Sequence, residues 1–279
     1  MSVVEYREYS VLMSVYHKEK PEYLKQAIES IQTQTLSTND FVLVCDGPLN
    51  EQLDGVIAMK QQEMGESLNV VRLAKNGGLG NALNEGIKHC KNELVARMDS
   101  DDIAYPDRCE KQIAVFNTHS EVSICSGIVE EFTTDPNTVD TRRVLPETNA
   151  EIVEFAKKRN PFNHPCVMFR RSEVLRAGNY QDFPGFEDYY LWVRMLRKGC
   201  KGYNVQEVIL DMRTGNGMYD RRGGGRYLVW VLRFQKYLYS RHFISTGRFL
   251  KNCIVRAAVG IVPGSVRERF YHIFLRNSK

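Results

Sequence analysis

Three carboxylates within four residues, those of Asp99, Asp101 and Asp102, directly follow a short apolar run. Crowded negative charges at the end of a predicted strand need a cation or hydrogen-bond donors to stabilise them. In an extended segment residues two apart share a side, so Asp99 and Asp101 can reach one ligand while Asp102 turns elsewhere. This pair suits Mg²⁺ or Mn²⁺, whose remaining ligands are typically water and phosphate oxygens. A solvated acidic turn before a helix is the alternative.

Short apolar runs alternate with helical patterns over the first 130 residues. Strands are expected at 9–15, 41–45, 69–73, 94–98 and 122–128, and helices at 21–34, 51–63, 80–90 and 107–118. This alternation predicts an α/β fold with a mostly parallel sheet flanked by helices. Ligands of such sheets bind beyond the carboxyl ends of the strands. Asp46, the loop at 76–80 and the acidic cluster are therefore expected to face one crevice.

The loop at 76–80, Asn-Gly-Gly-Leu-Gly, follows the third expected strand. It lacks the GxGxxG spacing, so a dinucleotide-binding fold is poorly supported. Its glycines could let a ligand approach the backbone, with N–H groups of the next helix behind it. A plain tight turn before a helix is an equally good interpretation.

The second half of the chain offers fewer candidates. Asp188 lies just before a predicted helix at 189–197, where helix N–H groups are expected to hold it ionised, as a general base requires. A helix-capping acid is the alternative. His164 precedes a predicted strand at 166–169, and such a histidine is more often structural than catalytic. Arg213 and the segment 220–225 suggest a flexible basic loop that could bind phosphates, or else a solvated linker.

The net charge of +4 is distributed unevenly. Residues 221–279 contain thirteen Lys or Arg and one acid, a net charge of +12, whereas residues 1–220 have a net charge of −8. On a helical wheel a basic arc, with Arg233 and Lys236, lies opposite an apolar arc of Leu228, Val231, Leu232, Phe234 and Leu238. This pattern predicts binding to an anionic membrane surface. The alternative is a helical subdomain packed on the body. No nucleic-acid partner is expected, because the body is acidic and contains no such motif.

Composition sets further limits. The seven cysteines are scattered without a CxxC pair, which favours reduced thiols in a cytosolic protein. The N-terminus lacks the apolar segment of a signal peptide, and no apolar run reaches the roughly 20 residues that span a bilayer. We therefore expect a cytoplasmic protein, peripheral on the inner face of the plasma membrane.

Five motifs, in this order, resemble those of family 2 inverting glycosyltransferases with the GT-A, Rossmann-like fold. They lie at 11–16, 44–47, 76–80, 99–102 and 187–188. Residues 186–192 and 221–224 are similar to bacterial enzymes that build O-antigen, capsule or exopolysaccharide. The resemblance implies a GT-A domain at 1–220, with a nucleotide-binding half at about 9–130 and an acceptor half at about 131–220. A basic helical region follows at 221–279.

The resemblance also implies roles for single residues. Asp101 would coordinate Mn²⁺ or Mg²⁺ on the diphosphate, together with Asp99. Asp188 would accept the proton of the acceptor hydroxyl, with Glu187 and His164 in the acceptor site. The residues implied to bind the nucleotide are Asp46 at the base, Asn76 and Gly78 at the base and ribose, Asp99 near the ribose, and Arg213, Arg221 and Arg222 at the diphosphate.

The implied reaction is the inverting transfer of one sugar from a nucleotide-sugar, a UDP-sugar by resemblance, to a saccharide on a polyprenyl diphosphate. The chain lacks the Gln-x-x-Arg-Trp motif of polymer-forming members, which favours a single transfer. Three other classes could use the acidic cluster. A phosphohydrolase of the haloacid dehalogenase type carries its Asp-x-Asp pair after the first strand, whereas here the pair follows the fourth. A nucleotidyltransferase usually has a glycine-rich basic loop after the first strand, whereas residues 15–19 contain no glycine. A non-catalytic nucleotide- or carbohydrate-binding protein would not need Asp188.

Overall fold

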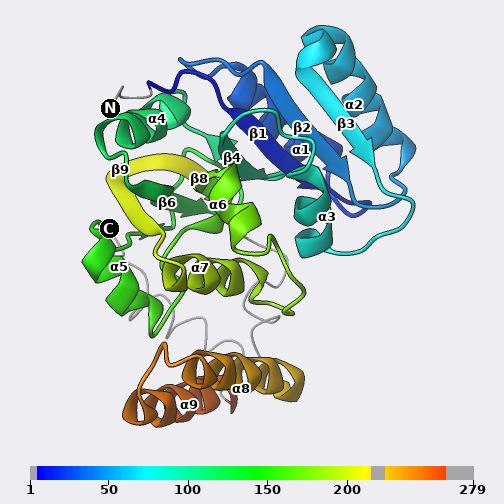
Figure 1. Cartoon of the computed structure of the whole chain (residues 1–279). Coiled ribbons are helices and arrows are strands. Elements are labelled where there is room, and N and C mark those ends of the chain that lie inside the picture. The colour runs from blue at the N-terminus through cyan, green and yellow to red at the C-terminus, as the bar shows by residue number, and fades with distance from the viewer. Residues whose placement is uncertain (1–4, 215–223, 262–279) are drawn as a thin grey trace.

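The computed structural model describes residues 5–214 and 224–261 (Figure 1). Its strands form one sheet in the order β3-β2-β1-β4-β8-β6-β9-β5, with β7 paired to β6. The first four strands of this order run parallel, and they are β3 (Leu68–Arg72), β2 (Asp40–Cys45), β1 (Ser10–Val15) and β4 (Leu94–Asp99). All four were predicted from the sequence. Their carboxyl ends therefore lie at one edge of the sheet, where the candidate residues follow them.

The sheet continues through strands of mixed direction. β8 is antiparallel to both β4 and β6, β6 and β9 run parallel, and β5 and β7 are short antiparallel additions. The bounds are β5 (Ile103–Ala104), β6 (Val122–Phe132), β7 (Thr141–Arg143), β8 (Met168–Arg170) and β9 (Lys201–Arg213). β9 was not predicted. Because it ends at Arg213, that residue belongs to the sheet rather than to a flexible loop.

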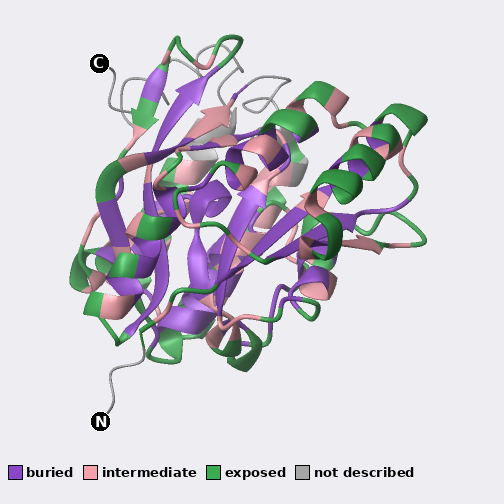
Figure 2. Ribbon diagram, turned by 90° about the horizontal axis from the view of Figure 1, so that it is seen from above, coloured by how far each residue is buried: buried purple, intermediate pink, exposed green. Residues whose placement is uncertain are grey.

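Helices cover both faces of the sheet because successive apolar side chains of its central strands point to opposite faces, and both sets must be buried. Val11, Met13 and Val15 share one core with α1 (Pro21–Gln32), α2 (Glu51–Met64) and α4 (Arg108–Thr118). Leu12 lies in the other core, with α3 (Leu79–Gly86), α5 (Asn149–Ala156), α6 (Arg171–Arg176) and α7 (Glu187–Arg197). Figure 2 shows the buried strands in the middle of the molecule and exposed residues on the outer sides of the helices. The predicted α/β architecture is confirmed.

Two helix boundaries differ from the prediction, and the second of them bears on the site. α3 ends at Gly86 instead of residue 90, and the chain continues as a turn. α7 begins two residues earlier than predicted, so Glu187 and Asp188 lie in its first turn. Their carboxylates are therefore positioned by a regular helix.

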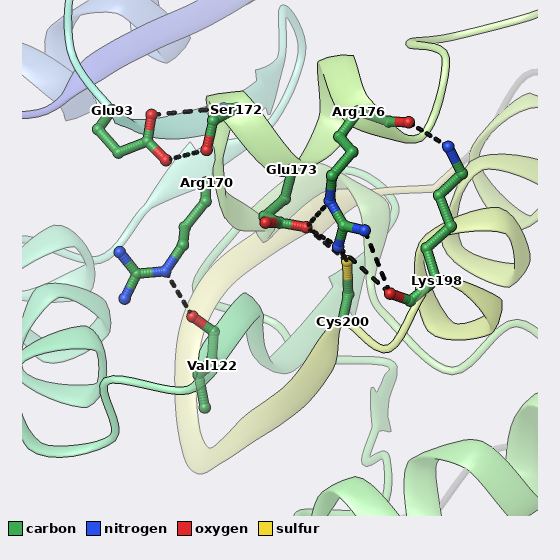
Figure 3. A network of polar contacts seen from close by, with 8 residues as sticks. All are labelled: Glu93, Val122, Arg170, Ser172, Glu173, Arg176, Lys198 and Cys200. Atoms are coloured by element: carbon green, nitrogen blue, oxygen red, sulfur yellow. Dashed lines mark hydrogen bonds and ion pairs between the residues drawn. The ribbon is translucent and has the colours of Figure 1, made fainter.

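A polar network fixes α6, which leads into the segment before α7 (Figure 3). Glu93 accepts hydrogen bonds from Ser172 at the start of α6. Glu173, also in the first turn of α6, accepts from Nε of Arg176 in the last turn at 2.9 Å and from the thiol of Cys200 at 3.0 Å. These contacts join α6 to Glu93, just before β4, and to Cys200, just before β9. They so restrain the segment that follows α6.

The C-terminal helices α8 (Gly224–Ser240) and α9 (Thr246–Ile261) lie beside one another below α7 in Figure 1. Val231, Phe234 and Leu238 of α8 are buried against Phe186, Tyr189 and Val193. The apolar arc predicted to contact a membrane thus packs largely on the body, because it completes a third apolar cluster. In the described part of the chain, no helix combines the length and apolar composition needed to cross a bilayer.

Candidate active site

Asp46 anchors the glycine loop at the end of β2. Its Oδ1 accepts a hydrogen bond from the Gly77 N–H at 2.8 Å and its Oδ2 accepts from the Gly78 N–H at 2.9 Å. The side-chain amide of Asn76 donates to the Asp46 carbonyl at 3.1 Å. The structure therefore brings Asp46, Asn76 and Gly78 together, as the order of the strands predicted. Each Asp46 carboxylate oxygen keeps a lone pair that could accept from a bound base.

Glycines make this close approach possible. Gly47 has φ +86°, and a Cβ there would lie 2.5 Å from the backbone nitrogen of Asn76. Gly78 has φ +84° at the N-cap of α3. Any other L-residue at either position would be strained, and at Gly47 it would also push the loop away from Asp46.

Asp99, the last residue of β4, forms an ion pair with Arg97 of the same strand. Arg97 Nη1 donates to Asp99 Oδ2 at 2.9 Å, and Nη2 donates to Oδ1. The two side chains lie on one side of the strand because they are two residues apart. Arg97 is completely buried, whereas about a third of the Asp99 side chain is exposed. Arg97 thus holds the Asp99 carboxylate at the border between the core and the site.

Asp101 lies in the turn that follows β4, and the side chain of the next residue, Asp102, is buried. Burial, with the negative charges of Asp99 and Glu19 nearby, raises the pKa of Asp101 to about 7. Asp102 is buried and accepts the Arg213 N–H at 2.8 Å, and burial with the charge of Asp101 raises its pKa as well. Glu19, after β1, accepts from the Ser100 hydroxyl at 2.7 Å. Three carboxylates, those of Glu19, Asp99 and Asp101, therefore lie within electrostatic reach of one another.

Arg213 lies beside this cluster in a fixed position. Its guanidinium stacks 3.7 Å from the centre of the Tyr23 ring, and its Nε donates to the Asp101 carbonyl at 3.1 Å. A second guanidinium nitrogen donates to Gln26 Oε1 at 3.0 Å. The arginine thus braces the turn that carries Asp101. Its contact with a diphosphate stays a prediction, and Arg221 and Arg222 lie outside the described residues.

Asp188, in the first turn of α7, is a part-buried carboxylate with two hydrogen-bond donors. The Tyr189 N–H donates to its Oδ1 at 2.7 Å, and the Asn160 amide donates to its Oδ2 at 2.5 Å. The sequence predicted that helix N–H groups keep this acid ionised. The Tyr189 N–H does lower the pKa of Asp188, but burial raises it by more, so the net shift is upward.

Glu187 and His164, the two residues predicted for the acceptor site, have different surroundings. A Cβ on Gly80 would lie 3.3 Å from Glu187 Cγ, so Glu187 packs against the start of α3, and burial raises its pKa. His164 is buried beside the Trp192 ring, 3.1 Å from the Tyr180 hydroxyl, and burial lowers its pKa. These contacts describe a buried, neutral histidine with a structural role. An acceptor contact for either residue stays a prediction.

The sequence matches the model of the family described as "Glycosyl transferase family 2" over residues 10–178. The chain belongs to glycosyl transferase family 2. It is 39% identical to the "Amylovoran biosynthesis glycosyltransferase AmsE" of Erwinia amylovora, over 94% of this chain and 97% of that one. It is 36% identical to the "UDP-Gal:alpha-D-GlcNAc-diphosphoundecaprenol beta-1,3-galactosyltransferase" of Escherichia coli, over 96% and 97%.

Solved structures of glycosyltransferases share the fold. TarS 1–349 of S. aureus has a TM-score of 0.64 at 14% identity, over 96% of this chain and 75% of that one. The mannosyltransferase PcManGT of Pyrobaculum calidifontis, solved with GDP-Man and Mn²⁺, has a TM-score of 0.59 at 14% identity, over 94% and 78%. The fold of this glycosyltransferase is GT-A, as predicted.

Three site residues of this family 2 enzyme had no role in the sequence prediction. Arg97 has a visible signal, since it is the one charged residue in the otherwise apolar run 94–98. Glu19 and Asn160 have none, because each lies in a loop and reaches its partner across a long sequence separation of 81 and 28 residues.

Within residues 5–214 and 224–261, no three His, Cys, Asp or Glu side chains are arranged to hold a metal ion.

Proposed function

We propose that this enzyme transfers one sugar, with inversion, from a UDP-sugar to a hydroxyl of a saccharide carried on a polyprenyl diphosphate. The printed name of the Escherichia coli relative gives a UDP-sugar donor and a diphosphoundecaprenol acceptor, and its similarity extends over nearly the whole of both chains. The name of the Erwinia amylovora relative places that protein in polysaccharide biosynthesis. Both names support a role in making a bacterial surface polysaccharide.

One observation carries the proposal. Asp188 lies close enough to Arg97 for the guanidinium to lower its pKa, and the same guanidinium forms the ion pair with Asp99. The charges of Asp99 and Asp188 also both act on Tyr180. This shared partner supports a single site in which a carboxylate suited to act as a base lies near an acidic pair suited to a metal–diphosphate, as a one-step displacement requires.

The acidic pair fits a divalent cation. Asp99 and Asp101 offer carboxylate oxygens. Burial and the nearby charges of Asp99 and Glu19 raise the pKa of Asp101, and a bound cation would lower that pKa again. Mg²⁺ commonly binds through one or two carboxylates plus substrate phosphates, so a third protein ligand is not needed. When bound, Mn²⁺ or Mg²⁺ would supply Lewis-acid stabilisation of the nucleoside diphosphate leaving group. Asp46, Asn76 and Gly78 would bind the base and ribose.

Asp188 would act as the general base. Burial raises its pKa above that of an ordinary aspartate, which makes the carboxylate a stronger proton acceptor. It would take the acceptor hydroxyl proton while the oxygen forms its bond to the anomeric carbon and the bond from that carbon to the UDP oxygen breaks. A single displacement from the side opposite the leaving group inverts the anomeric carbon. Asn160 and the Tyr189 N–H would hold the carboxylate in place during this step.

The test is product analysis. The protein is incubated with UDP-galactose, UDP-glucose or UDP-GlcNAc, Mn²⁺ or Mg²⁺, and a synthetic lipid-diphosphate GlcNAc acceptor. We expect UDP and a glycolipid, with the anomeric configuration opposite to that of the donor by NMR. Release of inorganic phosphate would favour a phosphohydrolase and release of pyrophosphate a nucleotidyltransferase. Nucleotide binding without any product would favour a binding protein.

A further inference from the structure

We propose that the outer face of the α8–α9 hairpin docks on an anionic bilayer surface. This docking face is defined by Val229 and Leu232 of α8 and by Leu250 and Ile254 of α9. The inference rests on the proposed function, because it names the surface that would bring the site to a lipid-linked acceptor. It differs from the sequence prediction, which assigned membrane contact to the arc of α8 that packs largely on α7.

Exposed aliphatic side chains are concentrated on this hairpin. Ile254 is 70% exposed, Leu250 55%, Val229 54% and Val255 49%, and every other large apolar side chain of the described residues is exposed by 40% or less. Such side chains cost free energy in water, and a contiguous group of them usually marks an interaction surface. Their position on the surface therefore calls for a partner with an apolar interior.

Contacts with the body use the opposite sides of both helices. On α9, Asn252 donates to the Lys157 carbonyl at 2.9 Å and to Gln235 Oε1 of α8 at 2.8 Å. Arg248 donates to Glu154 Oε1 at 2.6 Å, so α9 is fixed to α5. Leu250 and Ile254 are each two positions from Asn252 and so lie on other sides of the helix. Leu250 and Ile254 thus point away from the body while the hairpin stays attached to it.

Charge identifies the partner. The exposed side chains of Arg233, Lys236 and Lys251 are interspersed among the aliphatic residues, and the sequence has no acid between 224 and 261. Basic residues flanking an apolar face are suited to lipid headgroups, with the aliphatic groups reaching the acyl boundary. A symmetric contact between two copies would instead oppose the same positive charges, which is unfavourable. The observations therefore favour an anionic bilayer over self-association.

The hairpin is also joined to the catalytic side of the molecule. The Trp230 ring lies 3.8 Å from the position that a Cβ on Gly185 would occupy, and the Gly185 N–H donates to Glu187 Oε1 at 3.1 Å. Phe186, next in the chain, stacks on Phe234 of α8 at 4.8 Å between ring centres. The docking face and the first turn of α7, with Asp188, are therefore held in a defined relation. Docking would present this turn to acceptors on the same membrane.

The experiment is vesicle flotation of the full chain, without nucleotide or acceptor. Vesicles contain phosphatidylglycerol in phosphatidylcholine, and pure phosphatidylcholine vesicles serve as the comparison. We expect the wild type to float with the anionic vesicles. The double substitution Leu250→Ser with Ile254→Ser should weaken this binding by about tenfold or more, since each aliphatic group loses its transfer from water. The control Val144→Ser with Leu175→Ser, which changes exposed aliphatic residues elsewhere, should float like the wild type.

A second variant tests the charge. Replacing Arg233, Lys236 and Lys251 by Gln should reduce both flotation with anionic vesicles and its dependence on salt. The proposal is overturned if the wild type fails to float, if both variants float like the wild type, or if sedimentation shows a wild-type dimer that L250S/I254S converts to monomers. Transfer to a soluble acceptor is measured on the same samples. Intact transfer without flotation rejects only the docking face, whereas flotation without transfer rejects only the proposed function.

Discussion

The side-chain amide nitrogen of Asn160 donates to Asp188 Oδ2 at 2.5 Å, and the side-chain oxygen Oδ1 of Asn160 accepts the Phe162 N–H at 3.4 Å. The backbone of the 160–162 segment therefore favours the orientation in which Asn160 acts only as a donor to Asp188. A donor to a carboxylate stabilises its ionised form, so Asn160 lowers the pKa of Asp188 against the effect of burial. Other charged groups act on Asp188 as well, namely Arg97 from β4 and Arg143 from β7, which lower its pKa.

This relationship predicts a change in the pH profile of Asn160→Ala. Asp188 must be ionised to accept a proton, so transfer should rise with pH through the pKa of Asp188. In the wild type, transfer should rise at a pH above about 3.9, the ordinary pKa of an aspartate, because burial raises the pKa of Asp188. Without the Asn160 donor the pKa rises further, and the rise in kcat/KM should move to higher pH.

The matched control is Asn160→Ser, whose hydroxyl retains a donor, and it should shift the profile less than Asn160→Ala. Binding of UDP should be unchanged in both variants. An unchanged acid limb in Asn160→Ala, with reduced activity at every pH, would show that Asn160 has only a structural role.

The fold and the position of Asp46 beside the glycine loop were largely predictable from the sequence, for a physical reason. Residues that follow successive parallel strands must meet at one edge of the sheet, so Asp46, Asn76 and Asp101 could be grouped by their order in the chain alone. β9 was missed because charged and polar residues interrupt its apolar pattern. Asn160 was missed because its role depends on α7 packing beside its loop, which no local pattern encodes.

Asp46 offers a second prediction. Asp46→Ala removes the acceptors of the Gly77 and Gly78 N–H groups, which should release the glycine loop. Because the loop is partly in water, the cost in the free energy of unfolding should be modest, about 1 kcal/mol. UDP binding should also fall, by about tenfold or more, since the loop lines the proposed base site. Urea unfolding and calorimetry measure the two effects. Equal UDP affinity in the variant would remove Asp46 from the donor site.

Asp211 of β9 gives a prediction about stability. Burial, with the charge of Glu130, raises its pKa to about 6 in the folded protein, against about 3.9 unfolded. The folded state then binds the Asp211 proton more tightly than the unfolded chain does. The stabilising contribution of protonated Asp211 is therefore fully present below about pH 4 and is lost as the pH rises through about 6. Asp211→Asn should therefore stabilise the protein at pH 8 by about 1 to 2 kcal/mol.

This gain should vanish below about pH 4, where Asp211 is protonated in both states. Urea unfolding of the wild type and the variant at pH 4 and pH 8 provides the measurement. A stability difference that is the same at both pH values would contradict the assignment of the raised pKa to Asp211.

The acidic pair predicts metal-dependent nucleotide binding. Asp101→Asn keeps the shape of the side chain but removes the negative charge that would bind the cation. Calorimetry with UDP should show tight binding by the wild type in Mn²⁺, and the affinity of the variant should fall by about tenfold or more to the level seen with EDTA. Asp102→Asn is a poor control, because Asp102 accepts the Arg213 N–H in the core. Asp107→Asn, at the start of α4, changes a more distant acid and should bind UDP normally.

The central claim is that Asp188 is the base of a sugar transfer at this site. The most direct measurement compares the transfer rate and the UDP affinity of wild type and Asp188→Asn, with the lipid-diphosphate acceptor at saturation. We expect a loss of transfer of about 10² to 10⁴ fold with UDP affinity unchanged. A variant that transfers sugar at the wild-type rate would contradict this role for Asp188.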